Sequence, residues 1–439
     1  MPEIRRIVLE LLAQLGSSRE ARQYLKEFSE VDETRFAVVK VGGGIIEAQL
    51  DALASALAFL HRLGLRPVVL HGAGPQVDRA LDEAGIETRR VDGLRVTDDA
   101  VMEVARPVIY QQNMRLIEAL EERGIRARGI QHGVFRCDFL DREKLGLVGE
   151  IKSVDLSGLK SAVDSGALPV LTCLGESASG QVLNVNADIA ARELVWAIQP
   201  HKIIFLTPTG GLLDRDGRVL SAISLDNDYE ALMREPWVHS GMRLKLQQIN
   251  ELLSHLDRSA SVSITSADQL TRELFTYRGA GTLVRRGEEV HVHEQPAPSV
   301  MAEVAARVEQ SFGRSLGDEW PHSLDDPLVL LSESKRAAAV VVKGADGVPY
   351  LDKFVVTPDA QGEGLGAALW QVLCARFPAM YWRARTSNPV LSWYFQQART
   401  TDRRDGWVVF TVGIDDPQQR AGLVDDALER DSGWQEPGS

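Results

Sequence analysis

Two glycine-rich turns lie near opposite ends of this chain, and each has the form of a phosphate-binding turn. The first is Lys40-Val41-Gly42-Gly43-Gly44, and the second is Gln361-Gly362-Glu363-Gly364-Leu365-Gly366. Each turn follows an apolar run that is typical of a buried strand, and each precedes a helical pattern. Because glycine lets backbone N–H groups close around an anion at a helix N-terminus, the chain is predicted to bind two phosphorylated cofactors.

The composition limits the possible partners. The 439 residues are enough for two or three domains, and 49 Lys and Arg against 62 Asp and Glu give a formal net charge of -13. This acidic balance argues against a nucleic-acid surface and requires local cations for any anionic substrate. The three cysteines lack metal or redox spacing, no apolar stretch has membrane-spanning length, and the N-terminus lacks a signal peptide. We therefore expect a cytoplasmic location.

The first two thirds of the chain alternate between strand and helix patterns. A helical arm over residues 1–32 precedes a domain over residues 33–287, and the arm packs either on its own domain or on a neighbour. Strands are expected at residues 36–41, 67–70, 127–130, 168–172, 202–206, 262–265 and 282–284, and helices at residues 47–63 and 76–84. Such alternation predicts an α/β fold with parallel strands, whose ligands gather at the C-terminal strand ends.

The pattern changes after residue 287. Residues 288–300 contain two prolines and are predicted to be a linker, followed by a second domain over residues 301–439. Strands are expected there at residues 329–331, 338–343, 351–356, 379–385 and 408–412, and helices at residues 304–312 and 365–377. The polar tail from about residue 425 is expected to be disordered.

Cations cluster in the second domain. Arg383 and Arg385 are two residues apart on a predicted strand, so both side chains are expected on one face, where paired guanidinium groups suit carboxylates. The alternative is an ordinary solvated strand face. Lys353 adds a cation on a neighbouring strand, and Tyr394 follows at a predicted helix start. Taken alone, a tyrosine at such a position is more often a packed aromatic than a catalyst.

The second domain resembles GNAT acetyltransferases, specifically the acetyltransferase domain of vertebrate-type N-acetylglutamate synthases. The matched motifs are Tyr350-Leu351-Asp352-Lys353-Phe354, Trp382-Arg383-Ala384-Arg385, Asn388-Pro389 and Trp393-Tyr394-Phe395. The resemblance implies a GNAT α+β fold and acetyl transfer from acetyl-CoA to L-glutamate. It implies that Lys353, Arg383, Arg385 and Asn388 hold glutamate and that Tyr394 protonates the departing thiolate. It also implies that the acetyl-CoA pyrophosphate is held by Gln361, Gly362, Gly364, Leu365 and Gly366.

The first domain resembles the amino-acid kinase fold, and most closely N-acetylglutamate kinase. The matched elements are the strand followed by Lys40 and three glycines, His71-Gly72-Ala73-Gly74-Pro75-Gln76, Gly93-Leu94-Arg95-Val96-Thr97, Asn184-Val185-Asn186-Ala187-Asp188 and Gly241-Met242-Arg243-Leu244-Lys245. Each element alone is a weak signal, because a lysine at a strand end or an Asn-rich turn is usually structural. Together the two resemblances span nearly the whole chain.

The kinase resemblance implies a role for each matched residue. Lys40 and Lys245 neutralise the transferring phosphoryl group, and Asp188 orients these lysines. Arg95 holds the substrate α-carboxylate, and Asn184 contacts the substrate. Backbone N–H groups for phosphate come from Gly42, Gly43 and Gly44 in the first turn and from Gly72 and Gly74 in the second. The cofactors are ATP and Mg²⁺, since a carboxylate nucleophile needs cations rather than a general base.

The two activities join into one reaction sequence. The chain is predicted to acetylate L-glutamate and then to phosphorylate the N-acetyl-L-glutamate, the first two steps of arginine biosynthesis. One alternative is a synthase whose kinase-like domain is inert and senses arginine. Another is a non-catalytic amino-acid sensor that binds CoA and arginine.

Two further expectations concern regulation and assembly. Glu273 and Gly281 resemble the effector-binding end of arginine-sensitive kinases, which implies arginine inhibition; an ordinary surface acid is the alternative for Glu273. The resemblance also implies a homo-oligomer, either a tetramer or a hexamer.

Overall fold

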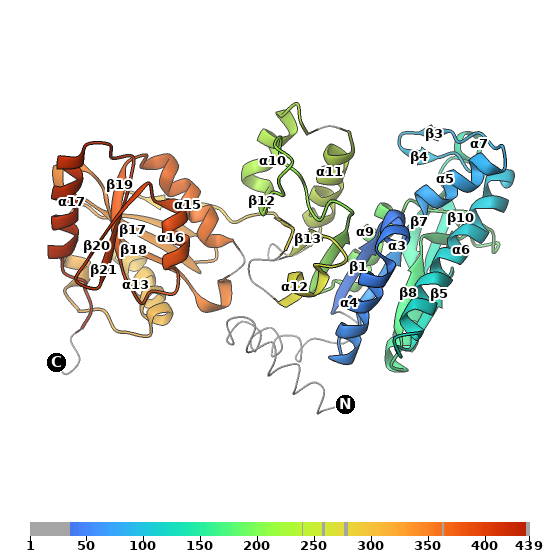
Figure 1. The fold of residues 1–439 in the computed structure, drawn as a ribbon, viewed down its shortest axis with the longest axis horizontal. Coiled ribbons are helices and arrows are strands. Elements are labelled where there is room, and N and C mark those ends of the chain that lie inside the picture. Colours follow the sequence, from blue (N-terminus) through green and yellow to red (C-terminus); the bar gives the residue numbers. More distant parts are fainter. Residues whose placement is uncertain (1–35, 239, 257–259, 276–279, 362–363, 436–439) are drawn as a thin grey trace. The chain divides into compact units, whose positions relative to one another are not determined.

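The computed structural model describes residues 36–238, 240–256, 260–275, 280–361 and 364–435. The expected N-terminal arm and Gly362 lie outside these residues. The chain forms two compact units, Met1–Arg286 and Gly287–Ser439. We describe each unit by itself (Figure 1).

An eight-stranded sheet forms the centre of the N-terminal unit, in the order β12-β14-β13-β11-β1-β2-β8-β5. All neighbours run parallel except β13 and β14. The strands are β1 (Ala37–Val41), β2 (Val68–His71), β5 (Ala127–Ile130), β8 (Leu168–Thr172), β11 (Lys202–Leu206), β12 (Ala222–Ser224), β13 (Ser261–Thr265) and β14 (Thr282–Arg285). The expected mostly parallel sheet is therefore confirmed.

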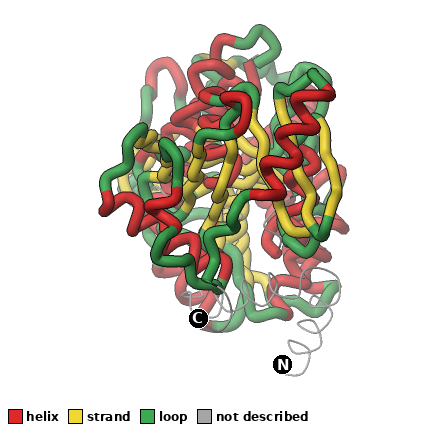
Figure 2. Tube along the Cα trace, turned by 90° about the vertical axis from the view of Figure 1, so that its left-hand side faces the viewer, coloured by secondary structure: helices red, strands yellow, loops and turns green. Residues whose placement is uncertain are grey.

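Helices cover both faces of this sheet, because its central strands are apolar on both sides. Val38 of β1 belongs to one core cluster, whereas Val39 and Val41 belong to a second cluster on the other face. The helices are α3 (Gly43–Ala48), α4 (Leu50–Arg62), α5 (Gly74–Glu83), α6 (Asp99–Glu121), α7 (Arg142–Leu145), α8 (Ser157–Asp164), α9 (Ala187–Ile198), α10 (Leu225–Arg234), α11 (Ser240–Ser254) and α12 (Leu270–Phe275). Figure 2 colours the described chain by helix, strand and loop.

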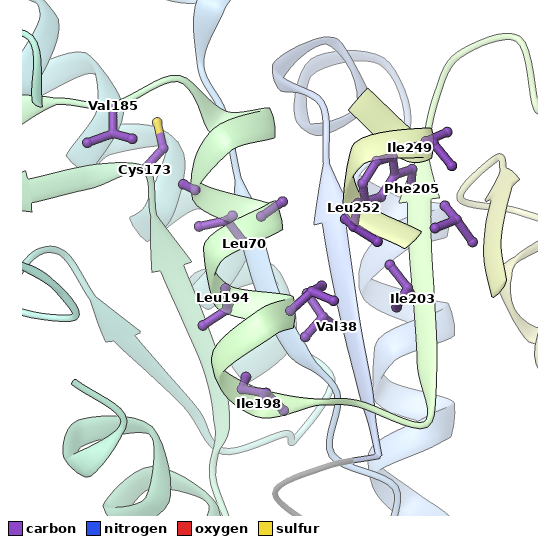
Figure 3. Close-up of a cluster of buried hydrophobic side chains, with 14 of the residues drawn as sticks. Val38, Leu70, Cys173, Val185, Leu194, Ile198, Ile203, Phe205, Ile249 and Leu252 are labelled. Carbon is purple, nitrogen blue, oxygen red and sulfur yellow. The ribbon is translucent and has the colours of Figure 1, made fainter. Parts of the chain in front are cut away.

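One of the two clusters brings α9 and α11 against the central strands. Leu194 and Ile198 of α9 pack beside Val38, and Ile249 of α11 packs beside Phe205 (Figure 3). Since side chains alternate along β1, Lys40 lies on the same face as Val38. The packing of α9 and α11 therefore carries their N-terminal turns toward the end of β1.

A second sheet was not expected from the sequence. Its order is β10-β9-β6-β7, with β6 (Phe135–Phe139), β7 (Gly149–Val154), β9 (Leu174–Glu176) and β10 (Val182–Asn184). The strands β3 (Arg90–Val91) and β4 (Leu94–Arg95) form a separate short hairpin. These strands are short and partly exposed, so they lack the apolar run that marks the central strands.

The C-terminal unit is a seven-stranded sheet in the order β15-β16-β17-β18-β19-β21-β20. Its strands are β15 (Val290–His293), β16 (Leu328–Ser332), β17 (Ala337–Val342), β18 (Tyr350–Val356), β19 (Met380–Arg385), β20 (Thr400–Arg404) and β21 (Trp407–Val412). Its α-helices are α13 (Pro298–Phe312), α14 (Trp320–Ser323), α15 (Leu365–Arg376), α16 (Leu391–Gln397) and α17 (Pro417–Glu429). The adjacent parallel strands β18 and β19 share a single ladder pair, Tyr350 with Tyr381.

Two expectations for this unit differ from the structure. Residues 288–300, expected as a linker, include β15, which pairs with β16 and belongs to the sheet. The polar tail expected from residue 425 is instead helical up to Glu429, because Leu423, Val424 and Ala427 are buried on one side of α17. Charged residues on the other side hide this amphipathic pattern.

Candidate active sites

The first site is centred on two lysines and one aspartate of the N-terminal unit. Lys40 Nζ lies 2.7 Å from Asp188 Oδ1. The side chain of Asn186 caps α9 by accepting from the backbone N–H of Asp188 at 2.8 Å, which places Asp188 in the first turn. Burial and then the charge of Lys40 lower the pKa of Lys245, whereas Asp188 raises it. The structure therefore brings these three predicted residues together.

Two helix N-termini face the same region of the sheet. Gly43 and Gly44 are the first residues of α3, and Gly74 is the first residue of α5, so their N–H groups have no acceptor within their own helices. A Cβ on Gly43 would lie 2.6 Å from Gln76 Oε1, whereas a Cβ on Gly44 would meet nothing within 4 Å. The first turn therefore combines a tightly packed glycine with an open one.

Gln76 joins the two turns. Its Nε2 donates to Gly43 O at 2.8 Å, while its Oε1 is buried without a hydrogen-bond partner. The Gln76 side chain is buried, although Gln76 lies in the first turn of α5, next to a loop. Gln76 belongs to a matched sequence motif, but the resemblance implied no role for it.

Gly72 does not fit its expected role, which is to donate a backbone hydrogen bond to phosphate. Its N–H donates to Val41 O at 3.0 Å, and this bond extends the pairing of β1 and β2. A Cβ on Gly72 would lie 3.1 Å from the Cβ of Ala187. Gly72 therefore serves the close packing of β2 against α9.

Arg95 and Asn184, far apart in sequence, are connected through Thr97. Asn184 Nδ2 donates to Thr97 Oγ1 at 3.0 Å, and Thr97 Oγ1 donates to Arg95 O at 2.9 Å. The Arg95 guanidinium lies 2.5 Å from a carboxylate oxygen of Asp78 and is almost fully buried. Asp78 lies outside the sequence motifs and Thr97 lies inside one of them, but the resemblance implied no role for either residue.

His71, the last residue of β2, is held in place beside this region by hydrogen bonds of its ring. Its Nε2 lies 3.0 Å from Asn113 Nδ2, and Asn113 Nδ2 also donates to Val170 O. Complete burial lowers the pKa of His71 to about 4, although a hydrogen bond with Gly72 O opposes this shift. His71 is therefore neutral at physiological pH, with Nε2 as the acceptor for Asn113.

The two predicted effector residues lie near each other. Glu273 Oε2 accepts from the backbone N–H of Ala280 at 2.5 Å. A Cβ on Gly281 would lie 2.0 Å from Ile264 O, so this position requires glycine. Glu273 is therefore hydrogen-bonded to the residue that directly precedes Gly281.

The second site lies on the C-terminal sheet. The guanidinium groups of Arg383 and Arg385 stack on the ring of Trp407, at 4.3 and 3.9 Å from its centroid. This geometry confirms that the two arginines share one face of β19. Arg385 is exposed, whereas Arg383 also donates to the carbonyl of Leu428 at the end of α17.

Lys353 lies on this same face of the sheet. It is only 6 % exposed, and its Nζ lies 5.3 Å from the centroid of the Trp320 ring. Nζ donates to Asp352 Oδ2 at 2.8 Å, and the indole N–H of Trp320 donates to the same oxygen. The carboxylate of Asp352 thus fixes the position of the ammonium group.

Tyr394 lies on the opposite face. Its ring packs against Trp382, Trp370 and Phe410, and Trp382 alternates with Arg383 along β19. Burial raises the pKa of the Tyr394 phenol, so the phenol is protonated at neutral pH. Beyond Tyr350, the backbone groups of β18 that face β19 have no ladder partner there. The cations and Tyr394 therefore approach this unpaired stretch from opposite sides.

The second glycine turn lies on the Tyr394 side. Gly364 caps α15 with a left-handed φ of 73°, which favours glycine, and Leu365 begins the helix with its side chain buried. A Cβ on Gly366 would approach Val356 Cγ2 to 3.3 Å, and Gln361 Nε2 donates to Val356 O at 3.5 Å. The turn is thus held against the end of β18.

Asn388 has a local role in the structure. Its Oδ1 accepts from the backbone N–H of Val390 at 3.0 Å, and its own N–H donates to Arg385 O at 2.9 Å. It connects the end of β19 to the start of α16 and so helps to orient Tyr394.

Among the described residues, no three His, Cys, Asp or Glu side chains are placed to hold a metal ion. No helix in that part of the chain is long and apolar enough to cross a membrane.

Comparisons with known proteins place each half of the chain in a family. The model of the amino acid kinase family matches residues 35–265, and that of the N-acetyltransferase of N-acetylglutamate synthase matches residues 300–430. The chain is 46% identical over 409 residues to an acetylglutamate kinase from Xanthomonas campestris pv. campestris, covering 92% of this chain and 96% of the relative. It is 29% identical to the mitochondrial N-acetylglutamate synthase of Danio rerio, over 93% of this chain and 77% of the relative.

A solved structure supports the fold. N-acetylglutamate synthase from Neisseria gonorrhoeae, complexed with coenzyme A and N-acetyl-glutamate, covers 90% of this chain and 98% of its own with a TM-score of 0.61 and 20% identity. At that identity the likeness concerns the fold alone. From these matches, the chain belongs to the amino acid kinase family and carries in addition the N-acetyltransferase domain of N-acetylglutamate synthases.

Proposed function

We propose that this chain is a bifunctional enzyme of arginine biosynthesis, with N-acetylglutamate synthase and acetylglutamate kinase activities. The observation that carries the proposal is the presence, in one chain, of two converging lysines with an aspartate and of an arginine pair with a buried lysine. The relatives bearing the two activity names match over nearly the whole chain.

The N-terminal unit performs phosphoryl transfer by positioning and by neutralising charge. The acceptor carboxylate is ionised at neutral pH, so the main barrier is the approach of two anions. Lys40 and Lys245 neutralise the transferring group from one side of the sheet, and Asp188 holds Lys40 in place. The N–H groups of Gly43, Gly44 and the α5 N-terminus orient phosphate oxygens.

Asp188, together with the ATP phosphates, would hold Mg²⁺ at this site. Magnesium is usually held by one or two carboxylates together with substrate phosphates, and Asp188 is a carboxylate at the described site. When bound, the ion supplies further neutralisation of the phosphate oxygens.

The C-terminal unit performs acetyl transfer across its sheet. Lys353, Arg383 and Arg385 hold the glutamate carboxylates on one face, and the turn at Gly364 holds acetyl-CoA on the other. The amine attacks the thioester carbonyl beside the unpaired backbone of β18, whose N–H groups, near Phe354 and Val355, stabilise the oxyanion. The Tyr394 phenol donates its proton to the departing thiolate.

Arginine inhibition and a homo-oligomeric, cytoplasmic enzyme complete the proposal. Glu273 of α12 accepts from the backbone N–H of Ala280, and a guanidinium group would pair with the same carboxylate. The tetramer or hexamer rests on the family resemblance alone.

The decisive experiment supplies glutamate, acetyl-CoA and ATP together and resolves the products by mass. We expect N-acetylglutamate and, after trapping with hydroxylamine, acetylglutamyl hydroxamate, with stoichiometric ADP. N-acetylglutamate without ADP would identify the alternative, a synthase with an inert kinase-like unit. Repeating both assays in millimolar arginine tests inhibition, and unchanged rates would exclude it.

A further inference from the structure

The last described residues cross one face of the C-terminal sheet. This face carries the three cations that are proposed to bind glutamate, the acetyl acceptor. Arg383 Nη2 donates to Arg430 O at 2.5 Å, and Lys353 Nζ donates to Ser432 O at 3.2 Å. We call residues 430–435 the strap. Two of the three cations assigned to glutamate are thus hydrogen-bonded to main-chain carbonyls of the strap.

The strap is attached on its far side to the segment after α13. Gln435 N–H donates to Ser315 O at 3.0 Å, and Gly317 N–H donates to Gly433 O at 2.9 Å. The ring of Trp434 packs against Phe312 and lies 5.0 Å from the Arg314 guanidinium. Arg430, the first residue of the strap, also forms an ion pair with Asp426 at 2.6 Å, and the centroid of the Trp434 ring lies 5.8 Å from Lys353 Nζ. None of these contacts belongs to the strand ladders, so the strap can open without disturbing the sheet.

The two cations need hydrogen-bond partners when no substrate is bound. Asp352 accepts one N–H of the almost fully buried Lys353 ammonium group, and leaving its other N–H groups unpaired is costly. The strap carbonyls supply neutral acceptors at positions that a carboxylate would also use. A carboxylate forms stronger charge-assisted hydrogen bonds with the same donors. Glutamate therefore has the chemistry to replace the strap.

We propose that the strap is an intramolecular occupant of the acceptor site, which glutamate displaces when it binds. This inference rests on the acetyl transfer proposed above. Binding then requires the open form, so the apparent KM for glutamate exceeds the intrinsic value by the reciprocal of the open fraction. Acetyl-CoA binds on the other face and does not compete with the strap.

Gly433 offers a point substitution that opens the strap. Its φ is 72°, and a Cβ there would lie 2.3 Å from Trp320 Cδ1, so Gly433→Ala pushes the strap away from the sheet. Gly347→Ala is the matched control, because Gly347 has a φ of 75° and a Cβ there meets nothing within 4 Å. Both variants carry the backbone cost of alanine at positive φ, but only the first carries the collision.

We expect Gly433→Ala to lower the KM for glutamate by about fivefold, as for an open fraction near one fifth, with the KM for acetyl-CoA unchanged. Gly347→Ala should keep the wild-type KM for glutamate. An equal KM in the two variants would overturn the proposal, and a raised KM in Gly433→Ala would mean that the strap completes the site.

Hydrogen exchange of the wild-type chain tests displacement directly. With coenzyme A present, glutamate should speed exchange at the amides of Gly317 and Gln435, because their acceptors move away. Slower exchange at these amides would contradict the proposal. If the wild-type chain acetylates no glutamate at all, the proposed function fails; if it does and neither variant nor exchange responds, only the strap proposal fails.

Discussion

Individual charged residues at both sites are positioned by partners that lie far away in the sequence. Lys40 is held by Asp188, and Lys353 is held by Asp352 and by the strap. The sequence was sufficient to find these lysines and arginines, because they belong to short motifs that characterise the two families. The motifs could not reveal that Arg383 also caps α17, because that contact depends on how α17 packs on the sheet.

Buried His71 leads to a pH prediction. Its pKa is about 4 in the folded protein and about 6.5 in the unfolded chain, so between these values only the unfolded chain takes up the proton. The free energy of unfolding therefore falls as the pH falls, by about 2 kcal/mol between pH 7.5 and pH 5 for this one group. Urea unfolding of the N-terminal unit should show this slope in wild type and lose that part of it in His71→Asn.

His132→Asn serves as the control for this experiment, because it removes a histidine from an exposed position. A loss of slope in His71→Asn that exceeds any change in His132→Asn identifies His71 as the group responsible. If His71→Asn keeps the full slope, then His71 is not the group responsible.

At the scale of elements, strands with continuous apolar runs were predicted to within about a residue at most ends. The edge strand β5 was also predicted, whereas the edge strands β12, β15 and β20 were missed. Residues 168–172 and 202–206 coincide with β8 and β11. The strands of the second sheet and β20 mix polar and apolar residues, so nothing local separates them from loops. The 23-residue helix α6 was also not predicted, and Pro107 lies inside it.

Gln76 connects two elements, and its removal should affect phosphoryl transfer. Gln76→Leu deletes the buried donor that holds Gly43 O and so loosens α3 against α5. We expect kcat for phosphoryl transfer to fall about tenfold, the size of one buried hydrogen bond. Acetyl transfer by the same preparation should be unchanged, which shows that the variant is folded.

Arg79→Leu is the matched control for Gln76→Leu. It removes the other tie between α5 and α3, a 2.8 Å ion pair with Glu47 that is exposed on both sides. Exposed pairs contribute little, so kcat should change less than twofold. Equal losses in the two variants would contradict a specific role for Gln76.

At the scale of the whole molecule, the two sets of catalytic residues belong to two separate compact units. Each site takes all of its described contacts from its own unit. Loss of chemistry at one site should therefore leave the other site intact.

Crosswise variants test this independence. Lys40→Met should lower phosphoryl transfer at least about 100-fold, because it removes a cation from the transition state, and should leave acetyl transfer unchanged. Tyr394→Phe should lower acetyl transfer by about 100-fold and leave phosphoryl transfer unchanged. The two rates are measured on one preparation, and a loss of both rates in either variant would contradict the independence of the units.

The sequence alone determined the two-part organisation, the class of each fold and the residue types at both sites. It could do so because apolar periodicity is a local property of the chain, and because short motifs carry the resemblance that implied the GNAT fold and the site residues. Only the tertiary structure decided which site groups already have a partner within the chain. Gly72 is hydrogen-bonded to Val41, Arg95 forms an ion pair with Asp78, and Lys353 is hydrogen-bonded to Ser432. Such pairings depend on distances between residues remote in sequence, and packing alone sets those distances.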